Sequence, residues 1–195
     1  MVNGIGNADL GVPDYKKALA QHADYIAALE ECGLQVKVLP PVQSFPDSTF
    51  VEDTALLTPH CAILTNPGAP TRTLETRSIL IALRKFYANI EIIEAPGTVD
   101  AGDIMMVGER FYIGLSERTN RAGAQRIITI LERNNMRGSV IKVTEVLHLK
   151  SGLGYLENNN LLAGGEFHAT PEFRQYNLLK VDPNEAYAAN SVWIN

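Results

Sequence analysis

Acidic side chains stand among bulky apolar residues in the stretch SFPDSTFVEDTA, which carries Asp47, Glu52 and Asp53. This mixture is unlike an ordinary solvated loop and predicts that the carboxylates bind a cation. A second stretch, APGTVDAGDIMM, places Asp100 and Asp103 beside two glycines, where an apolar segment begins. Carboxylates at the mouth of a strand can bind a cation or orient a histidine, and glycine lets the backbone approach a ligand closely. Aspartate and glycine are also common turn residues, so the second stretch alone leaves both interpretations open.

One histidine has neighbours typical of a pocket wall. His148 is predicted inside a strand in VLHLKSGLGYL, where a lysine, a serine and a glycine follow the next leucine. A single histidine in an apolar run is more often a core residue than a catalyst, but the polar residues and glycines that follow favour a pocket. The other three, His22, His60 and His168, are interpreted as structural or surface residues.

Two arginines lie in predicted loops, Arg72 in NPGAPTRT and Arg118 in GLSERTNRAG. Guanidinium groups bind carboxylates through two parallel hydrogen bonds. Together with the pocket acids, the arginines predict a zwitterionic ligand whose carboxylate meets arginine and whose cationic end meets the acids. The alternative is that both arginines form surface ion pairs, which contribute little to stability.

Length and composition narrow the class of protein. The chain has 195 residues with 46% hydrophobic content, which predicts a single domain over residues 1–195. A net charge of -5 argues against nucleic acid or an anionic membrane as partner, and no apolar run reaches the roughly 18 residues that span a bilayer. The first residues lack the basic patch and apolar core of a signal peptide. We therefore expect a cytoplasmic protein, in which Cys32 and Cys61 stay reduced.

Apolar periodicity and turn residues predict alternating helices and strands. We expect helices over 13–31, from a cap at Thr73 through Tyr87, from a cap at Ser116 or Thr119 through Leu131, and a short one beginning near Thr170 and Pro171. Hairpins are expected over 54–65, 103–114 and 152–165, and strands over 34–40, 90–96, 139–146, 177–181 and, as the start of another hairpin, 187–195.

These elements form a repeat of hairpin, helix and strand. Each hairpin opens on a polar residue, namely Asp53, Asp103, His148 and Asn190, at spacings of 50, 45 and 42 residues. Repeats of this length stack and share a core, and if they circle an axis their polar openings converge on a small pocket. The first module lacks its leading strand and the last stops after one strand. We therefore expect an incomplete ring whose unpaired strand edges favour a homodimer.

Four motifs closely resemble dimethylarginine dimethylaminohydrolases, particularly bacterial ones: FPDSTFVEDTA, GTVDAGDIMMVGERFYIGLSERTN, VLHLKSGLGYLENNNLLAGGEF and YAANSVWIN. The resemblance extends from about Gly11 to Asn195. It implies an α/β fold, a five-bladed propeller of the pentein type with about four of its five modules present, the first strand and the C-terminal module being absent. It also implies hydrolysis of Nω-methylated arginine to citrulline and a methylamine, with a small-molecule substrate and neither cofactor nor metal.

The resemblance assigns roles to individual residues. Asp100 is similar to the catalytic acid that holds the guanidinium and orients the histidine, and His148 to the general acid and base. The implied substrate contacts are Asp53 and Glu52 for the guanidinium side of the pocket, Asp47 for the α-amino group, Arg72 and Arg118 for the α-carboxylate, and Ile5 for apolar contact.

The family nucleophile is a cysteine, and neither cysteine of this sequence matches it. Cys32 ends the first predicted helix and Cys61 lies in an apolar strand, so both are interpreted as packing residues. We therefore expect the 195-residue chain to bind substrate without turnover. Two alternatives stay open: a non-catalytic remnant that binds arginine or methylarginine or that dimerises, and a deiminase that acts on arginine or agmatine.

Overall fold

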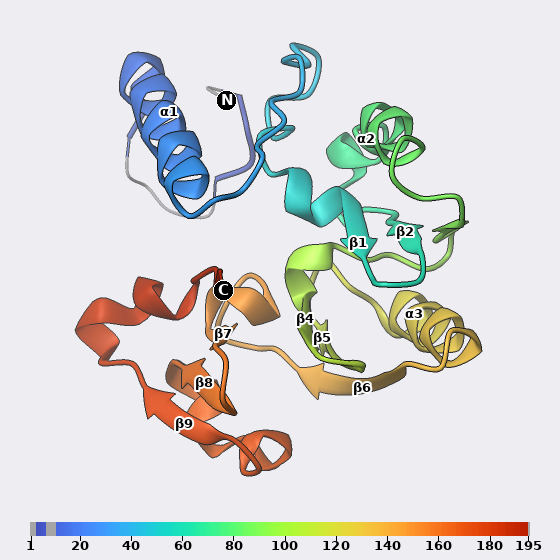
Figure 1. Cartoon of the computed structure of the whole chain (residues 1–195), viewed down its shortest axis with the longest axis vertical. Coiled ribbons are helices and arrows are strands. Elements are labelled where there is room, and N and C mark those ends of the chain that lie inside the picture. The colour runs from blue at the N-terminus through green and yellow to red at the C-terminus, as the bar shows by residue number, and fades with distance from the viewer. Residues whose placement is uncertain (1–2, 7–10, 195) are drawn as a thin grey trace. The chain divides into compact units, whose positions relative to one another are not determined.

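The computed structural model describes residues 3–6 and 11–194 of the chain (Figure 1). These residues form two compact units, one from the described residues up to Phe50 together with Ile194, and one from Val51 to Trp193. The expectation of a single domain over residues 1–195 stays a prediction.

The first unit contains one helix, α1 (Tyr15–Glu31), close to the predicted range. Asp14 caps it, because its Oδ1 accepts hydrogen bonds from the N–H groups of Lys16 and Lys17 at 2.9 and 3.1 Å. Gly33 follows with a φ of 84°, a left-handed conformation in which glycine carries no strain, and so stops the helix.

The strand expected over residues 34–40 is wrong. These residues have no strand conformation, and Val38 is 60% exposed. The apolar residues of LQVKVLP suggested a strand, but a strand also requires a hydrogen-bonded neighbour, and no described strand pairs with this segment.

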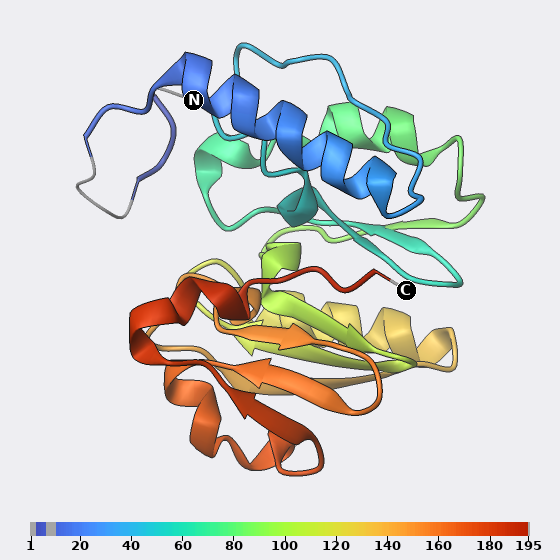
Figure 2. The ribbon, with the colours of Figure 1, turned by 60° about the vertical axis from the view of Figure 1, so that its left-hand side comes forward.

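The second unit contains three modules in sequence (Figures 1 and 2). The predicted order of hairpin, helix and strand is confirmed in the first two, whereas the third has 3₁₀ turns between its hairpin and its last strand. In every sheet the first two strands are antiparallel and the third is parallel to the second. The elements are β1 (Ala55–Leu57), β2 (Ala62–Leu64), α2 (Thr76–Leu83) and β3 (Ile90–Ile92); β4 (Ile104–Val107), β5 (Arg110–Leu115), α3 (Arg121–Arg133) and β6 (Arg137–Lys142); and β7 (Leu153–Tyr155), β8 (Asn160–Ala163) and β9 (Asn177–Lys180).

The middle sheet shows how the modules share a core. Alternate residues of β5 face opposite sides, so Phe111 packs in a cluster with Ile127 of α3, while Tyr112 points to the other side. There the Tyr112 ring meets Phe173 and Tyr176 of the third module edge to face, at centroid distances of 5.2 and 6.1 Å. The middle module therefore buries one face of its sheet on its own helix and the other on the third module.

The predicted helix caps are wrong. Thr73 does not cap α2, because it ends the 3₁₀ turn Pro70–Arg72 and its hydroxyl donates to the Pro70 carbonyl. Asn120 caps α3, with its side-chain oxygen accepting from the N–H of Gly123 at 2.8 Å. The two residues predicted for that cap, Ser116 and Thr119, instead donate their hydroxyls to a buried carboxylate described below.

Two further expectations near the C-terminus are wrong. The helix expected from Thr170 and Pro171 is a pair of 3₁₀ turns, Gly165–Ala169 and Pro171–Phe173. The strand expected over 187–195 is replaced by a 3₁₀ helix, Pro183–Ala189, and residues 190–194 without strand pairing, while Asn195 lies outside the described residues. The strands expected on either side of the three complete modules are thus not formed in the described part of the chain.

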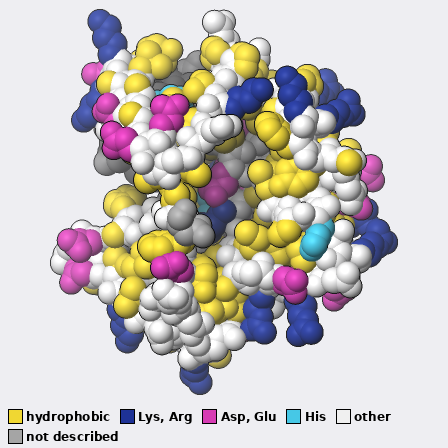
Figure 3. Space-filling model, in the orientation of Figure 1, with side chains coloured by type: hydrophobic (Ala, Val, Ile, Leu, Met, Phe, Trp, Pro, Cys, Tyr) yellow, Lys and Arg dark blue, Asp and Glu magenta, His cyan; other side chains and the backbone are white. Residues whose placement is uncertain are grey.

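Large apolar side chains are exposed at several places. In the first module Ile81 is 66% exposed and Phe86 is 71% exposed. Figure 3 shows apolar surface between charged groups on one face. Within the described ranges, no helix combines the length and the apolar character of a transmembrane segment.

Candidate active site

A short 3₁₀ turn precedes the first strand of each module, and we call these the opening turns: Val51–Thr54, Ala101–Asp103 and Leu149–Ser151. Consecutive opening turns contact one another, and the 3₁₀ helix Pro183–Ala189 contacts the third. The predicted openings therefore do converge, although Asn190 directly follows a helix and does not open a hairpin.

Carboxylates link the opening turns in sequence. Asp53 in the first turn accepts the N–H of Gly102 in the second at 3.1 Å. Asp103 in the second turn accepts the N–H of Leu149 in the third at 3.0 Å. A Cβ on Gly102 would lie 2.7 Å from the Oδ1 of Asp53 and 3.1 Å from the ring of His148, so only glycine fits there. The same interaction, repeated one module later, explains why acids recur at this spacing.

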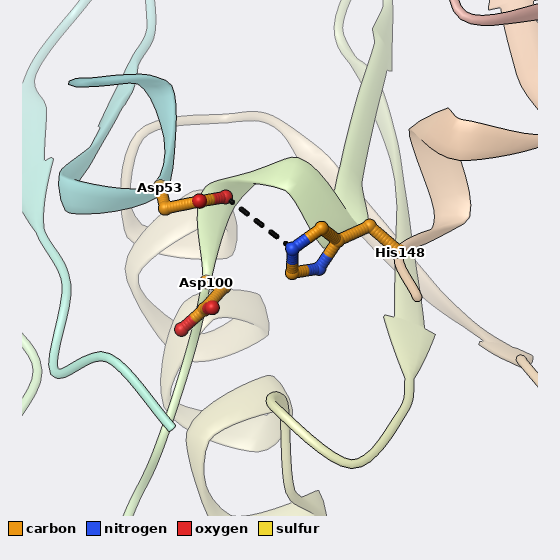
Figure 4. A group of neighbouring side chains, drawn as sticks. All are labelled: Asp53, Asp100 and His148. Carbon is orange, nitrogen blue, oxygen red and sulfur yellow. Dashed lines mark ion pairs between the residues drawn. The ribbon is translucent and has the colours of Figure 1, made fainter. Parts of the chain in front are cut away.

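His148 lies between the carboxylates of Asp53 and Asp103. Figure 4 shows its ring turned toward Asp53, with Asp100 nearby. The prediction that His148 lies inside a strand is wrong, because it directly precedes the third opening turn. Its Nε2 is 3.8 Å from the Oδ1 of Asp53, and its Nδ1 is 3.6 Å from the Oδ2 of Asp103. Nδ1 is buried and has no hydrogen-bond partner among the described residues.

The charges around His148 decide its protonation. Burial by itself lowers the pKa of His148, but the close approach of Asp103 and the negative charges of Asp53 and Asp100 outweigh burial and raise that pKa above its ordinary value. The imidazolium form is thus favoured in a site that is largely closed to water.

Asp100 is the most unusual acid of the group. It is 1% exposed, and its Oδ1 accepts the N–H of Gly68 at 2.8 Å. Its Oδ2 is buried without a hydrogen-bond partner in the described structure. Burial, followed by the charge of Asp53, raises the pKa of Asp100 in spite of the Gly68 hydrogen bond. An unsatisfied buried carboxylate oxygen requires an explanation, and a donor or cation supplied by a ligand would provide one.

Asp53 also belongs to a buried ion pair. Its Oδ2 lies 2.6 Å from the Nη1 of Arg72, and the same guanidinium contacts the Oε2 of Glu75 at 2.9 Å. Arg72 is 5% exposed. The alternative of a surface ion pair is therefore wrong for Arg72, whose charge is buried between two carboxylates and fixes the orientation of Asp53.

The loop that carries Arg118 is anchored to the same cluster. Ser116 and Thr119 each donate a hydroxyl hydrogen bond of 2.7 Å to the Oδ2 of Asp103. A Cβ on Gly68 would lie 2.3 Å from the backbone oxygen of Arg118, so this loop packs tightly beside the residue that binds Asp100. The half-buried Arg118 guanidinium has no hydrogen bond or ion pair with a described residue.

The remaining predicted site residues are Glu52, Asp47 and Ile5. Glu52 forms an ion pair with Lys150 of the third opening turn, and its side chain is 62% exposed. Asp47 and Ile5 belong to the first unit, where the Asp47 carboxylate accepts the N–H of Ile5 at 3.0 and 3.2 Å. The structure thus brings Ile5 and Asp47 together within that unit.

Two buried acids were missing from the predicted site. Asp103 is fully buried. The sequence predicts it as a hairpin opening and as an acid that could orient a histidine, and its place in the repeat after Asp53 is the signal that could have added it to the site. Glu75 gave no signal, because a glutamate three residues after an arginine is typical of an exposed helix pair.

The cluster also has donors that suit a metal. One ligand atom each from Asp53, Asp100 and His148 lie within 4.8 Å of one another. Two carboxylates and one imidazole can bind a divalent cation. They can equally bind a planar organic cation that donates several hydrogen bonds, which fits the unpartnered oxygen of Asp100.

Comparison with known proteins identifies relatives over the whole chain. A family model described as N,N dimethylarginine dimethylhydrolase, eukaryotic, matches residues 14–157. The N(G),N(G)-dimethylarginine dimethylaminohydrolase of Pseudomonas aeruginosa is 54% identical over 196 residues, which cover 100% of this chain and 77% of that protein. The protein of the same name from Streptomyces coelicolor is 34% identical over 149 residues, 76% of this chain and 58% of the relative.

Solved structures agree with these matches. A mutant of the Pseudomonas aeruginosa enzyme with serine in place of a cysteine, complexed with citrulline, has a TM-score of 0.98 at 54% identity and covers 100% of this chain and 76% of its own. The N-terminal domain of a cyanobacterial arginine dihydrolase in a product complex has a TM-score of 0.88 at 16% identity, with the same coverage. The second likeness concerns the fold alone. The expected pentein-type α/β propeller is confirmed.

Proposed function

Because this chain belongs to the dimethylarginine dimethylaminohydrolase family, we propose that its acidic cluster binds the guanidinium of an Nω-methylated arginine for hydrolysis to citrulline and a methylamine. Membership of the family supports a hydrolase that acts on guanidino groups. We further propose which substrate the chain binds and which role each residue of the cluster has.

One observation carries the proposal, namely the buried and unpartnered Oδ2 of Asp100. A guanidinium N–H donated to this oxygen would satisfy it and would lower the raised pKa of Asp100, since the carboxylate would gain an opposite charge. The carboxylates would also keep the guanidinium protonated, and a protonated guanidinium carbon is the better electrophile.

His148 is proposed as the general acid and base. Its raised pKa favours the imidazolium, which can give a proton to the amine that departs once a nucleophile has bonded to the guanidinium carbon. The neutral imidazole that results can then take a proton from the water whose oxygen displaces that nucleophile and becomes the ureido oxygen of citrulline. Asp53 and Asp103 on its two sides stabilise the charged form and fix the ring.

The proposed substrate contacts follow the surroundings of each residue. Arg118 is proposed to bind the α-carboxylate, since its guanidinium is not engaged by another described residue. Arg72 forms an ion pair with Asp53 and so orients it. We propose that Arg72 also contributes to binding the α-carboxylate of the substrate. We further propose Glu52 as an outer pocket acid, Asp47 as the acceptor of the α-amino group and Ile5 as an apolar contact.

The proposed hydrolysis needs a nucleophile besides the residues named above, and we propose that the 195-residue chain binds the substrate without turning it over. Cys61 is fully buried in the core, with its Sγ 3.5 Å from the hydroxyl of Thr58, and Cys32 follows the last turn of α1. Cys32 is exposed, so its interpretation as a packing residue is wrong, and neither cysteine is proposed as the nucleophile. A citrulline assay on the 195-residue chain should show no turnover above background, and robust turnover would show that the nucleophile has been misassigned.

Calorimetry with dimethylarginine tests the binding. The variant Asp100→Asn removes the charge and keeps the shape, and we expect it to weaken binding by roughly tenfold or more, as for loss of a charged hydrogen bond. The matched control is Asp24→Asn, on an exposed position of α1, and should bind as the unmodified chain does. Equal affinities for all three proteins, or no heat in any of them, would refute the proposal.

The residue proposed to bind the α-carboxylate, Arg118, allows methylarginine and agmatine to be distinguished as ligands. Agmatine has no carboxylate, so Arg118→Gln should leave agmatine binding unchanged and weaken the binding of any amino acid. If agmatine binds and dimethylarginine does not, the site serves a different guanidine.

We also propose that the chain forms a homodimer. A stable monomer at micromolar concentration in analytical ultracentrifugation would contradict this.

A further inference from the structure

Two arginines face each other at the start of neighbouring strands in the second module. Arg110 begins β5 and Arg137 begins β6, and the two are direct partners in the parallel register. Paired residues of a parallel ladder project from the same face of the sheet, so two positive charges stand side by side there. Like charges in this arrangement destabilise a sheet unless something neutralises them.

The surrounding protein does not neutralise this pair. Neither guanidinium forms an ion pair with a carboxylate of the described chain. The Nη1 of Arg110 donates to the Oε1 of Gln175 at 3.0 Å, and Gln175 donates in turn to the hydroxyl of Tyr112 at 2.9 Å. These contacts hold Arg110 in place but supply no negative charge. The Arg137 guanidinium makes no hydrogen bond with a described residue.

A hollow lies beside the two arginines. Its volume is about 330 Å³, and its walls include Arg110, Tyr112, Arg137, Ser139, Glu172 and Gln175. Ser139 lies two residues after Arg137, hence on the same face of β6, and adds a hydroxyl donor. Among the described residues of the wall, Glu172 is the only acid, so they carry two positive charges and one negative charge.

We propose that this hollow, the double-arginine pocket, binds the phosphate group of a small molecule. Two guanidinium forks and a hydroxyl offer more donors than the two oxygens of a carboxylate can accept, and they suit a tetrahedral dianion. The volume exceeds that of inorganic phosphate and leaves room for the organic part of a phosphate monoester. The pocket shares no residue with the cluster of Asp53, Asp100 and His148, so this site is separate from the proposed guanidine site.

Titration of the full chain with inorganic phosphate, followed by calorimetry, tests the pocket. Arg137→Gln should weaken phosphate binding by roughly tenfold or more, because it removes one charged fork. Glu172→Gln should strengthen it several-fold, because it removes the opposing charge. Arg133→Gln, an equally exposed arginine in the last turn of α3, should leave it unchanged. All three positions are exposed, so circular dichroism should show the same fold for each variant.

Further ligands identify the source of the phosphate group. Adenosine monophosphate that binds more tightly than phosphate supports a monoester, and equal binding supports free phosphate. Acetate that binds as tightly as phosphate would overturn the assignment to phosphate. Absence of phosphate binding, or equal binding to the unmodified chain and to Arg137→Gln, would overturn the pocket itself. Dimethylarginine binding should be the same for Arg137→Gln and the unmodified chain, so this result is independent of the proposed hydrolase function.

Discussion

The substitution Asp103→Asn should lower the pKa of His148. In the structure the Oδ2 of Asp103 lies 3.6 Å from the Nδ1 of His148, slightly beyond hydrogen-bond length, so the interaction is mainly one of charge. At an effective dielectric of about 20, two unit charges at that distance attract by roughly 4–5 kcal/mol, which is an upper figure. Asparagine keeps the shape, and its amide can still meet the hydroxyls of Ser116 and Thr119. We therefore expect the pKa to fall by at least about one unit, equivalent to about 1.4 kcal/mol.

Nuclear magnetic resonance measures this directly. The imidazole signals of the four histidines can be followed with pH, and His148→Gln identifies the signal of His148 by its absence. In the unmodified chain His148 should titrate above the ordinary value of about 6.5. A control, Asp24→Asn, should leave this titration unchanged. An unaltered pKa of His148 in Asp103→Asn would refute the claim that the charge of Asp103 raises that pKa. A higher pKa in the variant would contradict the claim as well, because removal of the negative charge should lower it.

Three further predictions concern stability. Gly102→Ala should destabilise the fold by about 1–3 kcal/mol in urea unfolding, because its Cβ would lie 2.7 Å from Asp53. Arg72→Ala should cost about 3–5 kcal/mol in the same measurement, since it leaves Asp53 and Glu75 buried without their cation. Asp100 has a raised folded-state pKa, so its contribution to stability is present below the unfolded pKa and is lost as pH rises through the folded pKa. Asp100→Asn should therefore raise the melting temperature at pH 7, and raise it less at pH 4.

Local signals were sufficient for most of the second unit. The third hairpin was predicted over residues 152–165, and it turns at Asn158 and Asn159, which adopt φ values of 56° and 65°. Apolar periodicity likewise predicted a helix through Leu131, and α3 buries Ile127 and Leu131. These features depend on the residues of one segment, so the sequence of that segment is enough to find them.

Tertiary contacts account for the errors. Ser116 and Thr119 have the side chains of helix caps, but Asp103 recruits both hydroxyls, and Asn120 caps α3 instead. Such competition between partners far apart in sequence is invisible in a local pattern. The convergence of Asp53 and His148 was predicted because the repeat itself encodes it.

The proposed guanidinium site depends most on the unpartnered Oδ2 of Asp100. A crystal structure of the chain with dimethylarginine tests it most directly. We predict a guanidinium nitrogen at about 2.7–3.0 Å from the Oδ2 of Asp100, with the imidazole of His148 beside the substituted nitrogen. Dimethylarginine bound elsewhere, with that oxygen paired to a protein donor, would contradict the account.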